Sequence, residues 1–280
     1  AGSAMVETGF NQKKNVAHTM AMNFMVYGIG VVGFWICGFA FMFGGGLNVA
    51  SLGGAAGVTS SEFTVHLFGH DFGLWGKAGY FLNSKVYDVG IFTLFLFQLV
   101  FMDTTATIPT GGMAERWKFS SFVIYGLIVG GLIYPLYGNW VWGGGWLAAL
   151  GTNFGLGHGH VDFAGSSVVH LTGGVLAFVG AAMIGPRIGK YNKNGTANAI
   201  PGHNIPMAII GCFILAFGWF GFNAGSALAA NSLAVSAFAT TNTAAAAAGL
   251  SWMFFDVMRG KKPSVIVFWV SAVVGLVAIT

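Results

Sequence analysis

Residues 161–186, VDFAGSSVVHLTGGVLAFVGAAMIGP, form a stretch that is long and apolar enough to cross a lipid bilayer as one helix. Asp162 stands near the start of this stretch, and His170 lies about 12 Å further along a helix axis, at about 1.5 Å per residue. An ionisable side chain at that depth is costly unless it faces a cavity, a partner or a substrate path. His170 is therefore either a histidine satisfied by a neighbouring helix or a residue that lines a pore, and the setting favours the pore.

The rest of the chain repeats this pattern of long apolar stretches. Seven full spans are expected, at 16–43, 89–113, 119–142, 161–185, 205–229, 232–258 and 264–280. Residues 1–10 are too short to span a bilayer and resemble the tail end of a helix. Only 7% of the residues are charged, against about 25% in soluble proteins, which excludes a water-soluble domain. The sequence predicts an all-α polytopic transmembrane helix bundle, with residues 1–280 as a single membrane domain.

The basic residues occupy alternate connections between these spans. Ten of the twelve Lys and Arg residues fall on one side of the membrane: Lys13, Lys14, Arg116, Lys118, Arg187, Lys190, Lys193, Arg259, Lys261 and Lys262. The opposite side keeps Lys77 and Lys85. Because loops rich in Lys and Arg stay in the cytoplasm, we expect a multi-pass protein of the cell (inner or plasma) membrane with these loops inside. The net charge of +4 reflects this placement and does not indicate nucleic-acid binding.

Aromatic residues gather near the opposite ends of the spans. Trp219, Phe222 and Ser226 stand at i, i+3 and i+7, which predicts one helix face, while Phe101 and Trp142 lie in other spans. An aromatic face attracts a small cation, and a serine oxygen accepts an N–H hydrogen bond. The alternatives are membrane-belt tryptophans and packing phenylalanines. Spacing alone favours those alternatives for Trp142 and Phe101. For the face of Trp219, Phe222 and Ser226, spacing leaves a cation site and simple packing evenly balanced.

One further acidic residue lies inside a span. Asp103 is an intramembrane carboxylate in the second full span, where Pro109 is expected to kink the helix. We expect Asp103 to pair with a hydroxyl of Thr104, Thr105 or Thr107, or with a neighbouring helix, ahead of any role toward a substrate.

A histidine-rich run precedes the fourth span. His158, His160 and Asp162 form the pattern H-x-H-x-D, which is a weak metal signal because it has no fourth ligand and no cysteine. We interpret the two histidines as solvated loop residues and expect no metal ion.

Several motifs together resemble the ammonium transporter (Amt/Mep/Rh) family, on its Amt side, over essentially the whole chain. The matching segments are QKKNVAHTMAMNFMVYG, FQLVF with GGMAER, WVWGGGWLAALG, VDFAGSSVVH and GWFGFNAGSALAANSLAVSAFATTNTAAAAAGLSW. The combination of DFAG, a VVH soon after it and GWFGFNAGS makes the resemblance specific.

The resemblance implies an outer site that recruits ammonium. Trp142 and Ser226 match the residues that hold the ion by a cation–π contact and a hydrogen bond. Phe101 and Phe222 match the stacked pair that closes the pore entrance, Phe101 also bordering the recruitment site, and Trp219 matches a residue behind Phe222.

Three further positions match the family. Asp162 matches a structural acid that braces the recruitment site, and Tyr134 matches a position near it. His170 matches the first of two hydrogen-bonded pore histidines. The second histidine of the family lies on a later span that this sequence does not contain, so the family's inverted repeat is incomplete here.

The implied function is transport of ammonium or ammonia, with methylammonium as an analogue, by a homotrimer that has one pore per subunit. An ion that gives up its proton enters an apolar pore as neutral ammonia, which potassium cannot imitate. The resemblance also implies a PII-type regulator on the cytoplasmic face. It implies neither catalysis nor a cofactor. The alternative is an ammonium-sensing membrane domain that is coupled to a signalling output.

Overall fold

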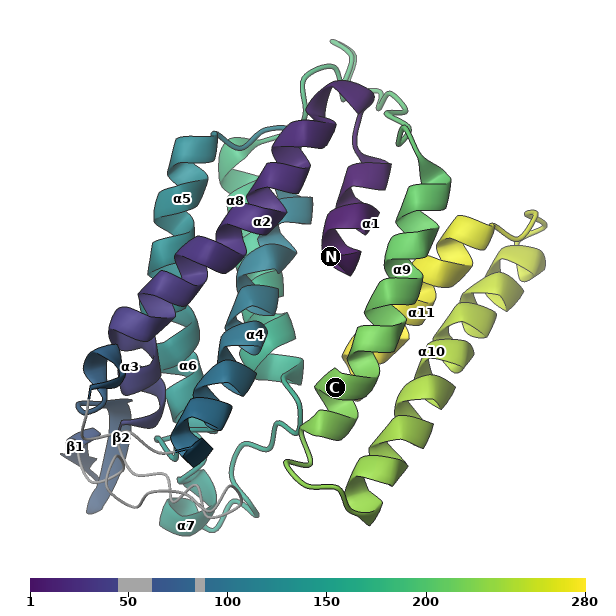
Figure 1. Ribbon diagram of the computed structural model, residues 1–280. Coiled ribbons are helices and arrows are strands. Elements are labelled where there is room, and N and C mark those ends of the chain that lie inside the picture. Colours follow the sequence, from purple (N-terminus) through teal and green to yellow (C-terminus); the bar gives the residue numbers. More distant parts are fainter. Residues whose placement is uncertain (45–61, 84–88) are drawn as a thin grey trace. The chain divides into compact units, whose positions relative to one another are not determined.

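The chain is mostly helical. The computed structural model describes residues 1–44, 62–83 and 89–280, whose path is drawn in Figure 1. Within these residues, six helices are long and apolar enough to cross a membrane: Lys13–Phe43, Val89–Gly112, Phe119–Val141, Ser166–Ile184, Ile205–Ala224 and Ser232–Met258. They confirm the multi-pass helical prediction. The seventh expected span is a shorter helix of 15 residues, α11 (Val265–Ile279).

The α-helices carry the labels of Figure 1 and have the following bounds. They are α1 (Gly2–Phe10), α2 (Val16–Gly33), α3 (Phe39–Phe43), α4 (Val89–Gly112), α5 (Phe119–Ile128), α6 (Tyr134–Val141), α7 (Leu150–Phe154), α8 (Thr172–Ile184), α9 (Ile205–Trp219), α10 (Ser232–Met258) and α11. Pro109 lies inside α4, which continues unbroken to Gly112.

Four spans of the described chain contain a π-helical turn. These turns are η2 (Phe34–Gly38), η6 (Val129–Ile133), η7 (Ser166–Leu171) and η8 (Phe220–Ala224). A π-turn inserts an extra residue into the helical repeat and is frequent at functional sites. Two of the four carry candidate residues, because His170 belongs to η7 and Phe222 belongs to η8.

The chain divides into two compact units. The first comprises Ala1–Phe24, Ile108–Lys118 and Gly174–Thr280, and the second comprises Met25–Thr107 and Phe119–Gly173. The helices α2, α4 and α8 contribute residues to both units.

In the second unit, glycines allow the backbones of two spans to approach each other closely. A Cβ atom added at Gly130 of η6 would meet the carbonyl oxygen of Gly30 in α2. A Cβ added at Gly38 of η2 would likewise meet the carbonyl oxygen of Gly130. Small residues at helix contacts are typical of membrane bundles, where helices associate through close van der Waals packing.

A β-hairpin precedes α4 in the second unit. Strand β1 (Glu62–Leu67) pairs antiparallel with β2 (His70–Gly76), and Phe68 and Gly69 form the turn with φ of 52° and 79°. Two consecutive positive φ values characterise the tight turns that suit the twist of a hairpin. The helical prediction did not include this hairpin. The hairpin lies between the expected spans 16–43 and 89–113. Residues 45–61 and 84–88 of the same connection, Lys85 included, lie outside the described residues.

The hairpin is attached to the end of α6 and to the segment that follows it. The strand register shifts between Phe63 and Thr64, so that Leu74 has no partner residue in the ladder. Its carbonyl oxygen accepts the indole N–H of Trp140 at 2.9 Å, and the backbone N–H of Trp146 donates to the Gly73 carbonyl oxygen at 2.9 Å. The hairpin therefore holds the chain on both sides of Trp142.

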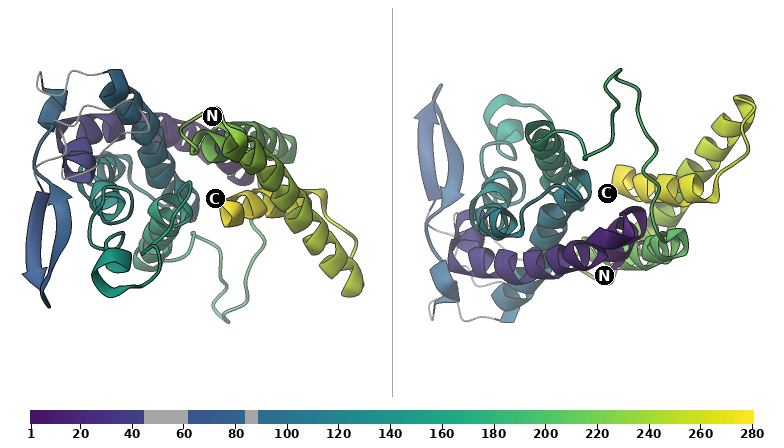
Figure 2. Two further views of the ribbon diagram at one scale, coloured as in Figure 1. Left: turned by 90° about the horizontal axis from the view of Figure 1, so that it is seen from below. Right: turned by 90° about the horizontal axis from the view of Figure 1, so that it is seen from above.

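In the first unit, α1 packs against α9, and α10 packs against α11. A Cβ at Gly211 of α9 would meet the backbone of Val6 and Gly2 in α1, and a Cβ at Gly249 of α10 would meet the ring of Phe268 in α11. Both views of Figure 2 show α10 and α11 side by side.

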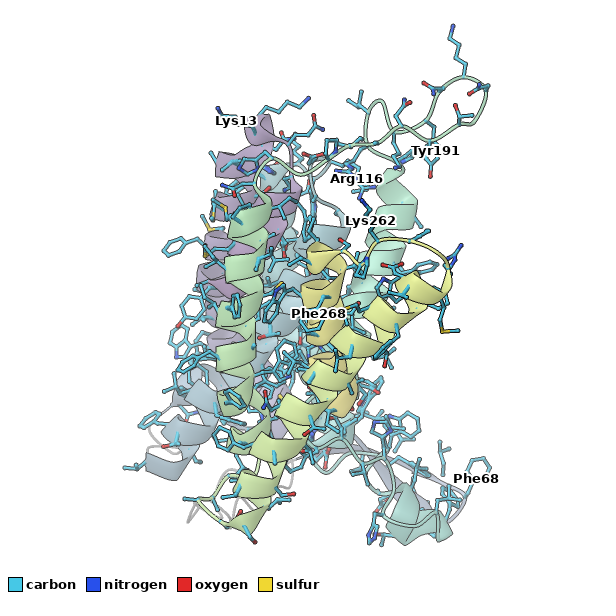
Figure 3. All side chains as sticks on the ribbon, turned by 90° about the vertical axis from the view of Figure 1, so that its right-hand side faces the viewer. Lys13, Phe68, Arg116, Tyr191, Lys262 and Phe268 are labelled. Atoms are coloured by element: carbon cyan, nitrogen blue, oxygen red, sulfur yellow. The ribbon has the colours of Figure 1, made fainter. Side chains whose placement is uncertain are left out.

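Basic residues of the first unit lie toward one end. Figure 3 shows Lys13, Arg116 and Lys262, which come from three different connections, toward the same end of this unit. The guanidinium of Arg116 donates to the carbonyl oxygen of Gly185, where α8 has ended. This arrangement agrees with the prediction that alternate connections share one side of the membrane.

Glu115 joins three segments at this end of the first unit. Its carboxylate accepts hydrogen bonds from the Gln12 backbone N–H at 2.6 Å, the Gln12 side-chain amide at 3.1 Å and Arg187 Nη1 at 3.1 Å. Burial would raise the pKa of Glu115, but hydrogen bonds from Gln12, Asn15 and Arg187 outweigh it and lower the pKa below its ordinary value.

We expect Glu115→Ala to lower the free energy of unfolding by about 1–3 kcal/mol at pH 7, because charged hydrogen bonds are lost. Since the folded-state pKa is depressed, this contribution is present above the unfolded pKa of about 4.3 and disappears as the pH falls through the folded pKa. Thermal unfolding in detergent between pH 7 and pH 3 measures it. Asp71→Ala, which removes the exposed pair with His66, is the control and should have little effect. An equal effect of Glu115→Ala at both pH values would contradict the prediction.

Candidate functional site

The candidate residues fall into both units. The second unit contains Phe101, Trp142, Asp162 and His170, and the first unit contains Trp219, Phe222 and Ser226. Each group has its own local geometry.

Trp142 is the residue directly after α6, and two contacts fix its indole. The ring lies edge-on to Phe101, with the centroids 5.8 Å apart and the planes at 81°. The indole N–H donates to the backbone carbonyl oxygen of Asp162 at 2.7 Å. Phe101 is buried, whereas Trp142 is half-buried and keeps part of its surface accessible. The second unit thus brings together three of the predicted residues.

The carboxylate of Asp162 caps the start of η7. Its Oδ1 accepts the backbone N–H groups of Gly165 at 2.5 Å and Ser166 at 3.1 Å. Its Oδ2 accepts the backbone N–H of Ser167 at 2.9 Å and of Val168 at 2.8 Å, and the Ser167 hydroxyl at 2.7 Å. The first N–H groups of a helix have no partner within the helix, and this one carboxylate satisfies four of them. Asp162 therefore lies before the helical span, which begins at Ser166, although it belongs to the expected span 161–185.

His170 lies in the π-turn that Asp162 caps. Its backbone N–H donates to the Gly165 carbonyl oxygen at 2.9 Å, and its side chain is half-buried. Tyr134, which the resemblance places near the recruitment site, is fully buried and donates its hydroxyl to Gln98 Oε1 at 3.0 Å. Gln98 stands on α4 three residues before Phe101.

Trp219, Phe222 and Ser226 do not lie on one regular helix face as predicted. Trp219 ends α9, Phe222 lies in η8, and Ser226 follows in a turn, because the π-turn changes the helical repeat. The three residues still adjoin. The rings of Trp219 and Phe222 have centroids 5.6 Å apart, and the Ser226 hydroxyl donates to the Phe222 carbonyl oxygen at 2.7 Å. The Trp219 indole donates to Thr280 Oγ1 at 2.9 Å.

The expected pairing of Asp103 with its threonine neighbours is wrong for two of them. The Thr104 hydroxyl donates to the Val100 carbonyl oxygen at 2.9 Å, and the Thr105 hydroxyl donates to the Phe101 carbonyl oxygen at 3.0 Å. Threonine in a helix commonly bonds to the carbonyl one turn earlier, which takes these hydroxyls away from the carboxylate.

Within the described residues, no group of three or more His, Cys, Asp or Glu residues could hold a metal ion. In the H-x-H-x-D run, His158 is exposed as expected, but His160 is half-buried. Its Nε2 lies 2.8 Å from Ser167 Oγ. Sequence reasoning missed this contact, because no spacing rule places His160 beside the side chain of Ser167.

Comparisons with known proteins agree on one family. A model of the Ammonium Transporter Family matches residues 1–280. The ammonium transporter Amt2 of Archaeoglobus fulgidus is 46% identical over 283 residues, which cover 100% of this chain and 55% of that protein.

Among solved structures, a protein named Sensor Amt Protein shares 36% identity with a TM-score of 0.83, over 99% of this chain and 63% of its own. Mep2 of Saccharomyces cerevisiae shares 25% identity with a TM-score of 0.74, over 100% of this chain and 57% of its own. The chain spans about half the length of the curated relatives that it matches.

We expect Asp162→Asn to lower the free energy of unfolding by about 3 kcal/mol or more, because an amide NH₂ cannot accept the N–H groups that it would face. Thermal unfolding and the yield of folded protein in detergent measure the loss. The same substitution at the exposed Asp71 is the matched control. Equal unfolding midpoints for the two variants would show that the carboxylate does not carry this turn.

Proposed function

Because the chain belongs to the ammonium transporter family, we propose that this multi-pass membrane protein carries ammonium or ammonia across the membrane. The observation that carries the proposal is the fixed indole of Trp142. Its N–H is bound to the Asp162 carbonyl and its ring rests against Phe101, so the aromatic surface is held in place before any ion arrives. A preorganised ring binds a cation without the cost of ordering a flexible side chain.

In the recruitment step, Trp142 supplies the aromatic face and Ser226 supplies a hydrogen-bond acceptor. The Ser226 hydroxyl gives its only hydrogen to the Phe222 carbonyl oxygen, so its lone pairs are oriented to accept an N–H from ammonium. Potassium has no N–H to donate, and this contact therefore favours ammonium over an alkali ion of similar size.

Passage beyond the recruitment site requires the ion to lose most of its water. Moving a bare charge into an apolar pore is prohibitive, whereas neutral ammonia crosses apolar surface easily. His170 is the residue proposed to guide ammonia and to take part in moving the released proton, because an imidazole both donates and accepts hydrogen bonds. Phe101 and Phe222 are proposed to gate the entrance, with Trp219 packed behind Phe222.

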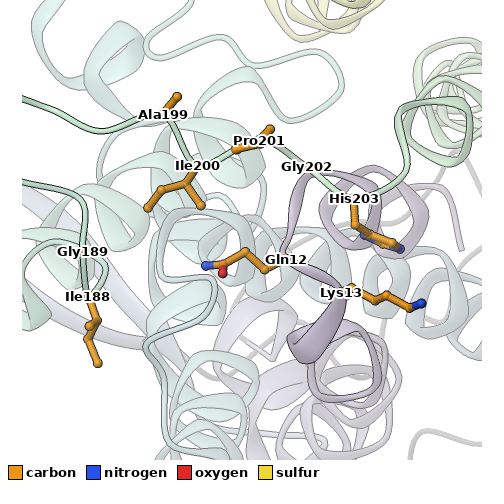
Figure 4. Close-up of a pocket in the computed structure, with 9 residues that line it drawn as sticks. All are labelled: Gln12, Lys13, Ile188, Gly189, Ala199, Ile200, Pro201, Gly202 and His203. Carbon is orange, nitrogen blue, oxygen red and sulfur yellow. The ribbon is translucent and has the colours of Figure 1, made fainter.

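The family also suggests how the protein is placed and regulated. We place the basic connections in the cytoplasm, and we propose a homotrimer with one pore per subunit. A PII-type regulator is proposed to dock at the basic end of the first unit. That end has an open pocket of about 430 Å³, in which Gln12 lies between Ile188–Gly189 and residues 199–203 (Figure 4). Lys13 and His203 are among the residues that line it.

The second candidate function is ammonium sensing, and the likeness to the protein named Sensor Amt Protein favours it. A sensor would bind ammonium and report it through an output domain without rapid flux. Ammonium binding by calorimetry combined with no ammonium-dependent current in liposomes would identify the sensor. Transport predicts both binding and current.

For the intact protein in proteoliposomes, we expect an ammonium-dependent current or pH change. Trp142→Leu should raise the half-saturating methylammonium concentration about 2- to 30-fold, the equivalent of a lost cation–π contact. Ser226→Ala should raise it about 2- to 10-fold through the lost acceptor, and His170→Asp should weaken the flux. Trp252→Leu, on the exposed side of α10, is the control. Equal flux of potassium would argue against an ammonium pathway.

Phe222→Ala should change the rate of methylammonium uptake while the helix bundle stays folded, because it removes a ring that is only half-buried. Uptake rates and thermal unfolding together test this expectation. Phe220→Ala removes the neighbouring ring, which stacks on Phe238 of α10, and serves as the matched control. If flux and inhibition by methylammonium both stay unchanged in Phe222→Ala, the residue is not part of the gate.

A further inference from the structure

His160 lies outside the described candidate site and reaches it through Ser167, which is bound to the carboxylate of Asp162. It is half-buried in the loop before η7, with its Nε2 2.8 Å from Ser167 Oγ. Its ring lies edge-on to Tyr137 of α6, with centroids 6.5 Å apart and planes at 70°. His160 therefore contacts both the helix that leads to Trp142 and the turn that leads to His170.

The direction of each hydrogen bond in this chain follows from the chemistry of the groups. The ionised carboxylate of Asp162 can only accept, so the 2.7 Å contact requires Ser167 Oγ to donate its single hydrogen to Oδ2. The serine oxygen then has only lone pairs to offer to His160. His160 Nε2 must therefore carry a hydrogen, in the neutral ring as in the imidazolium.

The resulting chain of donors ends on the carboxylate of Asp162, the residue whose backbone carbonyl oxygen fixes Trp142. His160 donates to Ser167, Ser167 donates to Asp162, and the Asp162 carbonyl oxygen accepts the indole N–H of Trp142. A hydroxyl that accepts a hydrogen bond becomes a better donor, so His160 strengthens the bond from Ser167 to the carboxylate.

We propose that His160 is a positioning residue for the outer cation site, acting through Ser167 and Asp162 on the indole of Trp142. The proposal rests on the proposed function, in which Trp142 recruits ammonium. It assigns His160 no contact with the ion and no part in moving its proton. The nearby His158, which is exposed, has no such role.

The test compares two substitutions that separate the ring from the donor. His160→Phe keeps an aromatic ring beside Tyr137 and removes the N–H, whereas His160→Gln keeps an N–H donor near the position of Nε2 and removes the ring. In proteoliposomes with methylammonium, His160→Phe should raise the half-saturating concentration about two- to tenfold, with the maximal rate changed by less than about twofold. His160→Gln should restore the half-saturating concentration, and His158→Phe should leave it unchanged. An effect of Gln as large as that of Phe would overturn the proposal, because ring packing would then be the cause.

A double variant tests whether His160 acts through Trp142. If it does, Trp142→Leu combined with His160→Phe should show the same half-saturating concentration as Trp142→Leu alone. If the two substitutions raise the half-saturating concentration additively, the proposal is overturned. It is also overturned if His160→Phe raises this concentration while Trp142→Leu alone does not.

A spectroscopic measurement separates this proposal from the recruitment site itself. ¹⁵N NMR of labelled histidine in lipid bilayers should show a protonated Nε2 at His160, with a signal that shifts in Ser167→Ala and persists in Trp142→Leu. A bare Nε2 would overturn the hydrogen-bond chain directly. If transport is insensitive to Trp142→Leu while the NMR result holds, the recruitment site fails and the positioning role fails with it, but the hydrogen-bond chain remains.

Discussion

The structure around the candidate site depends on one carboxylate meeting the exposed end of a helix. Asp162 satisfies four consecutive backbone N–H groups, those of residues 165–168, and a hydroxyl, within a segment that contains little else that is charged. A buried carboxylate without donors would be costly, and so would four buried N–H groups without acceptors. Each cancels the penalty of the other, and the turn that results determines where Trp142 and His170 can lie.

Close backbone packing supplies the second constraint. Gly30, Gly38 and Gly130 bring two spans of the second unit together at distances that no larger residue would allow. The π-turns η2 and η6 occur in the same region, where they shift the helical register. Helices in contact through their backbones make a firm support for Trp142, which follows one of these two spans and holds its ring edge-on to Phe101.

Much of this organisation was predictable from the sequence, because it follows from apolar length and from charge. Long apolar runs gave the helical spans, and the alternation of basic loops agreed with the positions of Lys13, Arg116 and Lys262. The features that the sequence did not reveal depend on local backbone geometry. The π-turn before Ser226 leaves no mark in hydropathy, and the hairpin at Glu62–Gly76 lies in a glycine-rich region with no strong alternation. His160 stands out in the sequence but was interpreted as a solvated loop residue. Its burial depends on where Ser167 lies in space, which the sequence does not show.

The irregular ladder of the hairpin has a consequence for how this region tolerates changes in length. Leu74 is the surplus residue of β2, and the carbonyl that the ladder leaves unused is the one that Trp140 binds. Paired residues added or removed beyond His66 and Asp71 would lengthen or shorten the tip and leave this anchor intact. Deleting one residue near Leu74 would restore regular pairing of the two strands. Trp140 would then lose the carbonyl oxygen that its indole binds. Related sequences should therefore vary in the number of residues at the tip of the hairpin. They should keep the one unpaired residue of β2 at the position of Leu74.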